Sequence, residues 1–274
     1  MYTLLQSRKI RGSAGEPLPI PFESLTALGT QFLRGGLSLT VAGPGTGKSA
    51  FMLTLALESK VPCLYFSADS DSFVQLTRSI SIRTGWSLEK SAAAVREDKL
   101  GDIIEQLSGV PLRFNYHASP TLDDIENSMQ AYEEVYGDYP ALVVIDNVTN
   151  VVGKTSSGDD DPFSGLESLM DYLATMARNT EAHVAGLHHV TGEYNDADKP
   201  IPLSGVKGQI TRVPSLVLTL HKKPSQIPGV DILAVSTVKN RGGRSDPSGK
   251  TFARLEFRGD TMSIKDPDDS WSVN

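Results

Sequence analysis

The chain has 274 residues, of which 39% are hydrophobic and 22% are charged, and its formal net charge is −7. This length suffices for one large domain, and no apolar run reaches the ~18 residues of a membrane span. The negative charge excludes a protein coated in basic residues for nucleic acid. The single cysteine, Cys63, cannot form an internal disulfide, and the chain does not begin with the apolar core of a secretory signal. We therefore expect an intracellular protein without a membrane span.

The predicted elements alternate between strands and helices over most of the chain. Residues 1–35 are rich in Pro, Gly and Ser, which predicts an arm or linker; residues 36–266 are expected to form the domain and 267–274 a tail. Runs that indicate strands occupy 37–42, 61–67, 111–116, 141–147 and 182–189, and four more occupy 215–222, 231–240, 251–259 and 261–265. This order predicts an α/β fold with a mostly parallel sheet flanked by helices, and antiparallel strands added at the C-terminal end.

The segment Ala42–Ser49, AGPGTGKS, follows a predicted strand and opens a predicted helix. It matches the phosphate-binding pattern GxxxxGK[ST], with Ala42 in the place of the first glycine. Glycines let backbone N–H groups turn toward phosphate oxygens, Lys48 neutralises the β and γ phosphates, and the Ser49 hydroxyl is a ligand for Mg²⁺. The residues expected to bind the nucleotide are Gly43, Pro44, Gly45, Thr46, Gly47, Lys48, Ser49 and Ala50.

Carboxylates follow two of the predicted strands. Asp146 ends the strand at 141–147, at the sheet edge where ligands bind in open α/β folds, so we expect it to hold Mg²⁺ directly or through water. Hydrolysis also needs a residue that activates or positions water. Asp69 and Asp71 follow the strand at 61–67, which neighbours the loop strand in many such sheets. Asp69 is our choice for the general base and Asp71 the alternative, although either could instead cap the next helix.

The order of these motifs resembles the RecA-like motor domain of the DnaB family of replicative helicases, over about residues 20–265. In that family a strand ending FSLE supplies the Glu that activates water, and FSAD at 66–69 places Asp69 there. The metal strand of the family reads VIDY or similar, and here it reads VIDN. HHVT at 188–191 is similar to the GHVT of the RadA and KaiC relatives, which implies that His189 senses the γ-phosphate. The resemblance implies ATP as the nucleotide.

Two later segments resemble parts of the family that act outside the nucleotide loop. LSGVKGQI (203–210) corresponds to the loop that lines the central channel, which implies that Lys207, Gly208 and Gln209 contact the backbone of single-stranded DNA. KNRGG (239–243) resembles a KxRxG motif whose basic residues reach the nucleotide of the neighbouring subunit, so Lys239 and Arg241 take that role, on a strand expected at the sheet edge. A solvated loop and a basic hairpin turn are the alternatives.

The resemblance implies an ATPase and DNA helicase motor that assembles into a ring, expected to be a hexamer, and translocates on single-stranded DNA during replication in the cytoplasm of a bacterial or phage-infected cell. The first 35 residues cannot supply the family's N-terminal helical domain, so we expect a motor domain of the kind that phages encode, with a helicase loader or primase as a partner. Two other interpretations stay open. One is a RadA- or KaiC-like ATPase in recombination or a protein switch, and the other is a nucleotide-dependent scaffold with little turnover.

Overall fold

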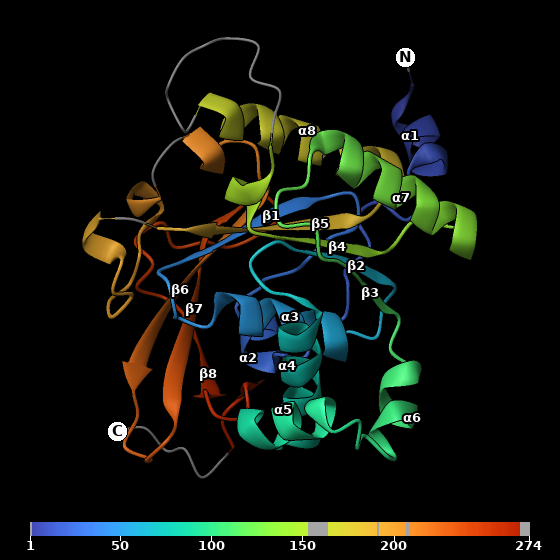
Figure 1. Ribbon diagram of the computed structural model, residues 1–274. Helices are drawn as coiled ribbons and strands as arrows, with labels where there is room; N and C mark the ends of the chain where they lie inside the picture. The colour runs from blue at the N-terminus through green and yellow to red at the C-terminus, as the bar shows by residue number, and fades with distance from the viewer. Residues whose placement is uncertain (1, 153–163, 191, 207–208, 269–274) are drawn as a thin grey trace.

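The computed structural model describes residues 2–152, 164–190, 192–206 and 209–268. Within these ranges the chain forms one nine-stranded sheet with the strand order β3-β2-β4-β5-β1-β6-β7-β8-β9 (Figure 1). The strands that pair in parallel are β1 (Leu37–Ala42), β2 (Cys63–Ser67), β3 (Leu112–Asn115), β4 (Leu142–Asp146), β5 (His183–His189) and β6 (Leu216–Pro224). The remaining strands, β7 (Asp231–Asn240), β8 (Ala253–Arg258) and β9 (Ser263–Lys265), are antiparallel additions. The predicted α/β class, with antiparallel strands at the C-terminal end, is therefore confirmed.

The strand order differs from one expectation. The loop strand β1 pairs with β5 and β6, whereas β2 pairs with β3 and β4. The expectation that the strand preceding Asp69 lies beside the loop strand is wrong, because β4 and β5 separate the two. The order of strands in a sheet depends on pairing between segments far apart in the chain. The local sequence of β2 therefore does not predict that β4 and β5 lie between it and β1.

Helices cover both faces of the sheet (Figure 1). On one face lie α2 (Glu23–Ala27), α3 (Lys48–Glu58), α4 (Ser72–Thr84), α5 (Leu88–Arg96) and α6 (Ile103–Ser108). The other face is covered by α7 (Leu122–Tyr136) and α8 (Ser164–Thr180). Short 3₁₀ turns occupy parts of the connections: η1 (Val148–Asn150), η2 (Gly192–Tyr194), η3 (Leu203–Gly205) and η4 (Gln209–Thr211). Each face has its own apolar core, and Cys63 is fully buried as its apolar run predicts. In the part of the chain that the structure describes, no helix combines the length and apolarity needed to cross a membrane.

Side-chain caps stabilise the starts of α4 and α7, the helices that follow Asp71 and Thr121. The Asp71 carboxylate accepts a hydrogen bond from the Val74 N–H at 2.9 Å and so caps α4. Thr121 caps α7 through a reciprocal pair of hydrogen bonds with Asp124. An N-cap of this kind stabilises a helix by about 1 kcal/mol, so these residues have a structural function that is complete without a ligand.

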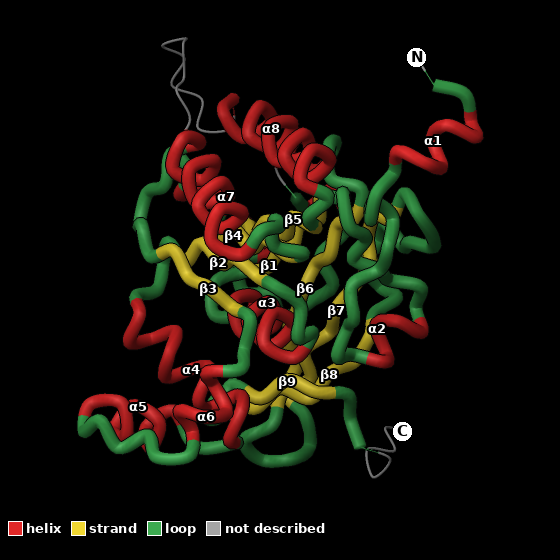
Figure 2. The backbone as a smooth tube through the Cα atoms, turned by 90° about the vertical axis from the view of Figure 1, so that its right-hand side faces the viewer, coloured by secondary structure: helices red, strands yellow, loops and turns green. Residues whose placement is uncertain are grey.

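The segment expected to be an N-terminal arm or linker has two parts. Helix α1 (Leu4–Ile10) has no buried residue and lies at the periphery (Figure 2). Further along, Phe22, Leu25 and Phe32 are fully buried, and the Phe22 ring stacks on Phe51 of α3 at 5.1 Å between ring centroids. The second half of the segment therefore packs into the core beneath the loop helix, because its aromatic side chains bury large apolar areas.

Candidate active site

The loop between β1 and α3 has the backbone that its glycines allow. Gly45 and Gly47 adopt φ values of +70° and +108°, which side chains with a Cβ resist. Gly47 is the N-cap residue of α3, so the helix begins at Lys48 and its free N–H groups face the loop. At Gly43 an added Cβ would clash with the carbonyl group of Asn195. The loop thus has the shape that a phosphate-binding turn before a helix requires.

Lys48 is directed into the sheet edge. Its side chain is 4% exposed, and its Nζ donates to Asn147 Oδ1 at 2.5 Å and lies 3.5 Å from Asp146 Oδ1. Burial lowers the pKa of Lys48, and the neighbouring Asp146 carboxylate opposes that shift. The ammonium group is therefore held at the carboxyl ends of the parallel strands, where the predicted phosphate site lies.

Asp146 ends β4 and is 4% exposed. Its Oδ2 accepts a hydrogen bond from the Tyr65 hydroxyl at 3.0 Å, and the peptide bond between Asp146 and Asn147 is cis. Tyr65 lies within β2 and is fully buried, so its hydroxyl orients the carboxylate from the neighbouring strand. Ser49 follows Lys48, and both residues line a cavity at the phosphate loop, which we call the loop cavity. The two predicted magnesium ligands, Ser49 and Asp146, offer the hard oxygen donors that Mg²⁺ prefers.

Asp69 and Asp71 have different surroundings. The Asp69 carboxylate accepts hydrogen bonds from the side-chain amides of Asn147 and Asn150, the second at 2.9 Å. Asn147 also contacts Lys48, so the carboxylate is linked to the phosphate loop through one intervening side chain. Asp71 instead caps α4. This geometry supports the choice of Asp69 over Asp71 as the candidate base, although β2 is not the neighbour of β1.

The two histidines at the end of β5 point to opposite faces of the sheet, because side chains alternate along a strand. His189 lines the loop cavity, and its Nε2 lies 3.1 Å from Asn147 Nδ2. Burial lowers the pKa of His189, and the nearby Lys48 ammonium lowers it further. His188 is 4% exposed, and burial lowers its pKa to about 4. His189 is thus the histidine that lines the loop cavity.

The cavity at the loop contains residues that the sequence patterns did not single out. Arg78 of α4 lines it, and its NH1 donates to Ser70 Oγ at 3.2 Å. Phe257 of β8 and Met262 close the cavity, and the Phe257 ring lies 3.3 Å from the place that a Cβ on Gly47 would occupy. The sequence signal for Arg78 is a cation on α4, the helix that begins three residues after the candidate base Asp69. Phe257 has no local signal, since it lies 210 residues after Gly47 and reaches the loop only through the sheet.

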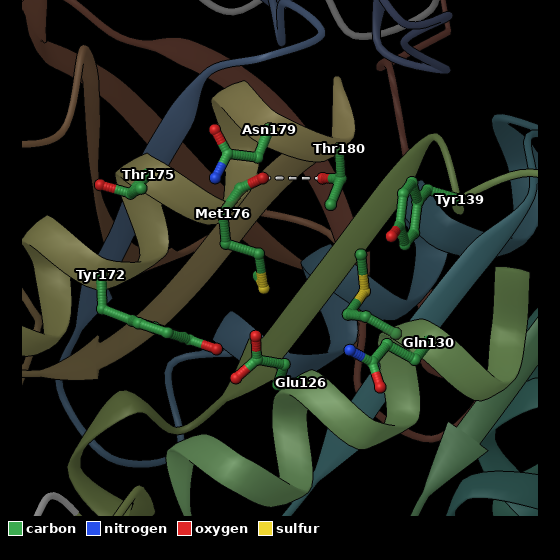
Figure 3. Close-up of a pocket in the computed structure, with 9 residues that line it drawn as sticks. Glu126, Gln130, Tyr139, Tyr172, Thr175, Met176, Asn179 and Thr180 are labelled. Atoms are coloured by element: carbon green, nitrogen blue, oxygen red, sulfur yellow. Dashed lines mark hydrogen bonds between the residues drawn. The ribbon is translucent and has the colours of Figure 1, made fainter.

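A second hollow lies between α7 and α8, on the face of the sheet opposite α3 (Figure 3). Its labelled side chains converge from the two helices and the segment before β4, and the Thr180 hydroxyl donates to the Met176 carbonyl at 2.8 Å. The residues that line it are Glu126, Met129, Gln130, Tyr139, Tyr172, Thr175, Met176, Asn179 and Thr180. None of them belongs to the loop network, so the two cavities are separate.

The predicted DNA-binding residues are only partly visible. Lys207 and Gly208 lie outside the described residues, whereas Gln209 begins η4, and its Oε1 accepts from Arg212 NH1 at 2.6 Å. The described remainder of this connection packs on the sheet face shared with α7 and α8 through Ile201, Val206 and Ile210. Its path is therefore fixed on both sides of Lys207.

The predicted trans residues bind the backbone of that same connection. Lys239 Nζ donates to the carbonyls of Thr211 at 2.6 Å and Arg212 at 2.9 Å, and Arg241 NH2 donates to the Arg212 carbonyl at 2.6 Å. Neither side chain lines the loop cavity of its own chain. The expectation that their strand lies at the sheet edge is wrong, because β7 pairs with β6 on one side and β8 on the other. Pairing with β8 stops at Val235, however, so the half of β7 near Lys239 extends beyond it.

The fold and this site define a RecA-like P-loop domain: a phosphate loop follows the central strand, and a carboxylate ends a strand two positions away. A family model described as an AAA domain, AAA_25, matches residues 16–193, and the chain belongs to this family. It is 62% identical over 267 residues to the Gene 65 protein of Mycobacterium phage L5, covering 97% of this chain and 99% of that protein. The Gene 65 protein of Mycobacterium phage D29 is 64% identical over 232 residues, covering 84% of this chain and 99% of that protein.

More distant relatives connect the chain to replicative helicases. The replicative DNA helicase DnaB of a Nostoc strain is 24% identical over 189 residues, covering 66% of this chain and 21% of that protein. A DnaB-like replicative helicase superposes with a TM-score of 0.76 at 16% identity, covering 97% of this chain and 65% of that one. A structure solved as an isolated ATPase domain also gives 0.76, at 17% identity, covering 97% and 96%. The RadB recombinase gives 0.57 at 18% identity, covering 92% and 100%. The fold is therefore that of DnaB-like helicase ATPase domains, as the motif order predicted.

Proposed function

We propose that the chain is an ATP-hydrolysing motor of the DnaB-like helicase type that assembles into a ring and translocates on single-stranded DNA. One observation carries this proposal. The buried ammonium group of Lys48 lies beside Asp146 and is linked through Asn147 to Asp69 and His189, at the carboxyl edge of a RecA-like sheet. A phosphate-binding cation, a metal-binding carboxylate, a candidate base and a candidate sensor are the parts that phosphoryl transfer to water requires.

In this proposal the loop backbone from Gly43 to Ala50 cradles the phosphates, and Lys48 moves from Asn147 and Asp146 to the phosphate oxygens. Ser49 and Asp146 would hold Mg²⁺, which neutralises charge on the phosphates when it is bound. Asp69 accepts the proton of the attacking water. Each of its oxygens accepts one amide N–H and keeps a further acceptor position for that water. His189, at the end of β5, contacts the γ-phosphate.

Ring assembly, DNA contact and location extend the proposal to the rest of the molecule. Lys239 and Arg241 would act on the nucleotide of the neighbouring subunit, and the connection from Lys207 to Gln209 would contact DNA phosphates. The relatives from mycobacterial phages support action in the cytoplasm of an infected bacterial cell. The DnaB-like helicase structure is described with its interactions with primase, and by analogy we propose a primase or a helicase loader as a partner here.

The decisive test is ATP turnover with and without single-stranded DNA, for the wild type and for Lys48→Ala. We expect DNA to stimulate the wild type, and the variant to lose at least about 10²–10³-fold in kcat because a preorganised cation on the phosphates is removed. Lys99→Ala is the matched control, since this exposed lysine pairs with Glu97 far from the loop. Turnover by Lys48→Ala near the wild-type rate, with an unchanged melting curve, would refute the site.

The turnover measurement, together with assays of assembly and of forked-duplex unwinding, separates the alternatives. A wild type that binds ATP and assembles but shows no turnover with DNA would be a nucleotide-dependent scaffold. Turnover stimulated by DNA without unwinding of a forked duplex would favour an ATPase of the RadA or KaiC type. The helicase proposal requires both stimulation and unwinding.

A further inference from the structure

Asn147 lies at the centre of the site but belongs to none of the predicted catalytic roles. It directly follows Asp146, it is 2% exposed, and its side chain contacts Lys48, Asp69 and His189. These three residues come from α3, the segment after β2 and the end of β5. One buried amide therefore joins three elements of the site.

The chemistry of its neighbours fixes how this amide is oriented. A lysine ammonium group only donates hydrogen bonds, so the atom that faces Lys48 must be the amide oxygen. The NH₂ group then faces Asp69, as it must, because an ionised carboxylate only accepts. In the reverse orientation the NH₂ group would face the ammonium group of Lys48, donor against donor, and the amide oxygen would face the Asp69 carboxylate, acceptor against acceptor.

This orientation also determines the tautomer of His189. The NH₂ group of Asn147 lies 3.1 Å from Nε2 of His189 and can only donate to it. This contact assigns the unprotonated nitrogen to Nε2 and the ring proton to Nδ1, which is buried without a hydrogen-bond partner among the described residues. The charged groups around this ring are Lys48 of α3, Asp69 after β2 and Asp146 of β4, with Arg78 of α4 lining the same cavity.

We propose that Asn147 is a positioning residue for ATP hydrolysis, which couples the occupancy of the phosphate loop to the orientation of Asp69 and the tautomer of His189. The inference rests on the proposed function. Phosphate oxygens that capture Lys48 remove the charged donor from the amide oxygen, while the NH₂ group of the same amide holds the candidate base and sensor. Loading of the loop thus reaches both residues through a single planar group.

Substitutions at this position separate the two ends of the amide. Asn147→Ala removes both. Asn147→Asp keeps an acceptor for Lys48 but turns a second carboxylate toward Asp69. Asn150→Ala is the matched control, because Asn150 donates to the same Asp69 carboxylate at 2.9 Å and makes no hydrogen bond to Lys48 or His189.

The first measurement is independent of turnover. In the nucleotide-free protein labelled with ¹⁵N-histidine, and with His189→Gln used for assignment, we expect the His189 signal of the Nδ1–H tautomer at neutral pH. Asn147→Ala should lose that preference and Asn150→Ala should keep it. An Nε2–H tautomer in the wild type would overturn the inference, even if every variant at position 147 failed to fold.

The second measurement separates binding from chemistry. We expect Asn147→Ala to lose about 10²-fold in kcat, the scale of a misplaced catalytic group, with a KM for ATP within a few-fold of wild type. Asn147→Asp should lose more, and Asn150→Ala only a few-fold. Equal changes in kcat and KM, or wild-type kcat in Asn147→Ala, would contradict a positioning role. Absence of turnover in the wild type would instead refute the proposed function, and the tautomer measurement would still test the amide.

Discussion

The nucleotide loop network and the Lys239–Arg241 segment show two ways in which this chain holds its cations. Lys48 is buried, and its partners are the side chains of Asp146, the last residue of β4, and Asn147, which follows it. Lys239 and Arg241 donate only to backbone carbonyls of the connection before β6, and in the described residues no carboxylate lies within ion-pair distance of either. The first cation is paired with side chains of its own chain, whereas the other two contact only backbone carbonyls among the described residues. This difference agrees with the proposal that one subunit builds the chemistry of the loop and a neighbouring subunit completes it.

The strongest test of this division is Arg241→Ala. We expect a loss of about 10³–10⁵-fold in kcat with ATP binding retained, because an arginine that stabilises the transferring phosphoryl group in trans has effects of this size. Mixing Arg241→Ala with Lys48→Ala should restore part of the activity, since one subunit supplies the arginine and the other the intact loop. Arg244→Ala, three residues away and exposed, is the control. Turnover linear in protein concentration, with no recovery in mixtures, would show that the site is complete within one chain.

Within the loop network, Asp69→Asn should reduce kcat by about 10²–10⁴-fold and preserve nucleotide binding, because the amide keeps the shape of the side chain and removes the base. Asp71→Ala should leave kcat unchanged and lower the free energy of unfolding by about 1 kcal/mol, the contribution of an N-cap. Turnover and denaturant curves measured on both variants check this pair. A larger loss of turnover in Asp71→Ala than in Asp69→Asn would reverse the assignment.

A buried histidine close to the loop strand predicts a pH dependence of the free energy of unfolding. His183 begins β5, hydrogen-bonds Ser38 Oγ and the Leu33 carbonyl at 2.8 Å each, and burial lowers its pKa from 6.5 to about 4. The unfolded chain binds more protons between these values, so stability is complete above about pH 6.5 and falls as the pH decreases toward 4, by up to about 3 kcal/mol. Urea unfolding at several pH values should show this slope. The slope should decrease without vanishing in His183→Gln, because burial also lowers the pKa of His188 to about 4, and it should be unchanged in His117→Gln, whose side chain is exposed.

The smallest expected effect concerns the connection between β5 and β6, whose backbone is contacted by Lys239 and Arg241. Lys207→Ala should weaken binding to single-stranded DNA and reduce the dependence of log K on log salt by roughly one unit, while basal turnover stays unchanged. Lys199→Ala is the control in the same connection, because this lysine pairs with Glu193. Titrations over a range of salt concentrations check the difference. An equal slope for Lys207→Ala and the wild type would make the connection a solvated loop.

The sequence by itself determined the parts of this protein that depend on neighbouring residues. The glycines of the loop, the helix that starts at Lys48, the apolar strand that ends in Asp146 and the alternation of strands and helices are local patterns, and the structure has each of them. Backbone sterics, side-chain periodicity and end effects act over a few residues, so they can be read without the fold. They were sufficient to predict an α/β domain with a phosphate loop, and the order of the motifs added the resemblance to RecA-like motors.

Only the tertiary structure decided which of these parts meet. It separated β2 from β1 by two strands, enclosed β7 between β6 and β8, and packed Phe22 beneath the loop helix. It also brought Phe257 onto Gly47 and joined Lys48, Asp69 and His189 through the amide of Asn147. Strand order and such contacts follow from non-local pairing and core packing, whose free energy is shared among residues far apart in the chain. A buried asparagine after the candidate metal carboxylate has no periodicity or spacing of its own, so its place in the site became visible only when the strands were assembled.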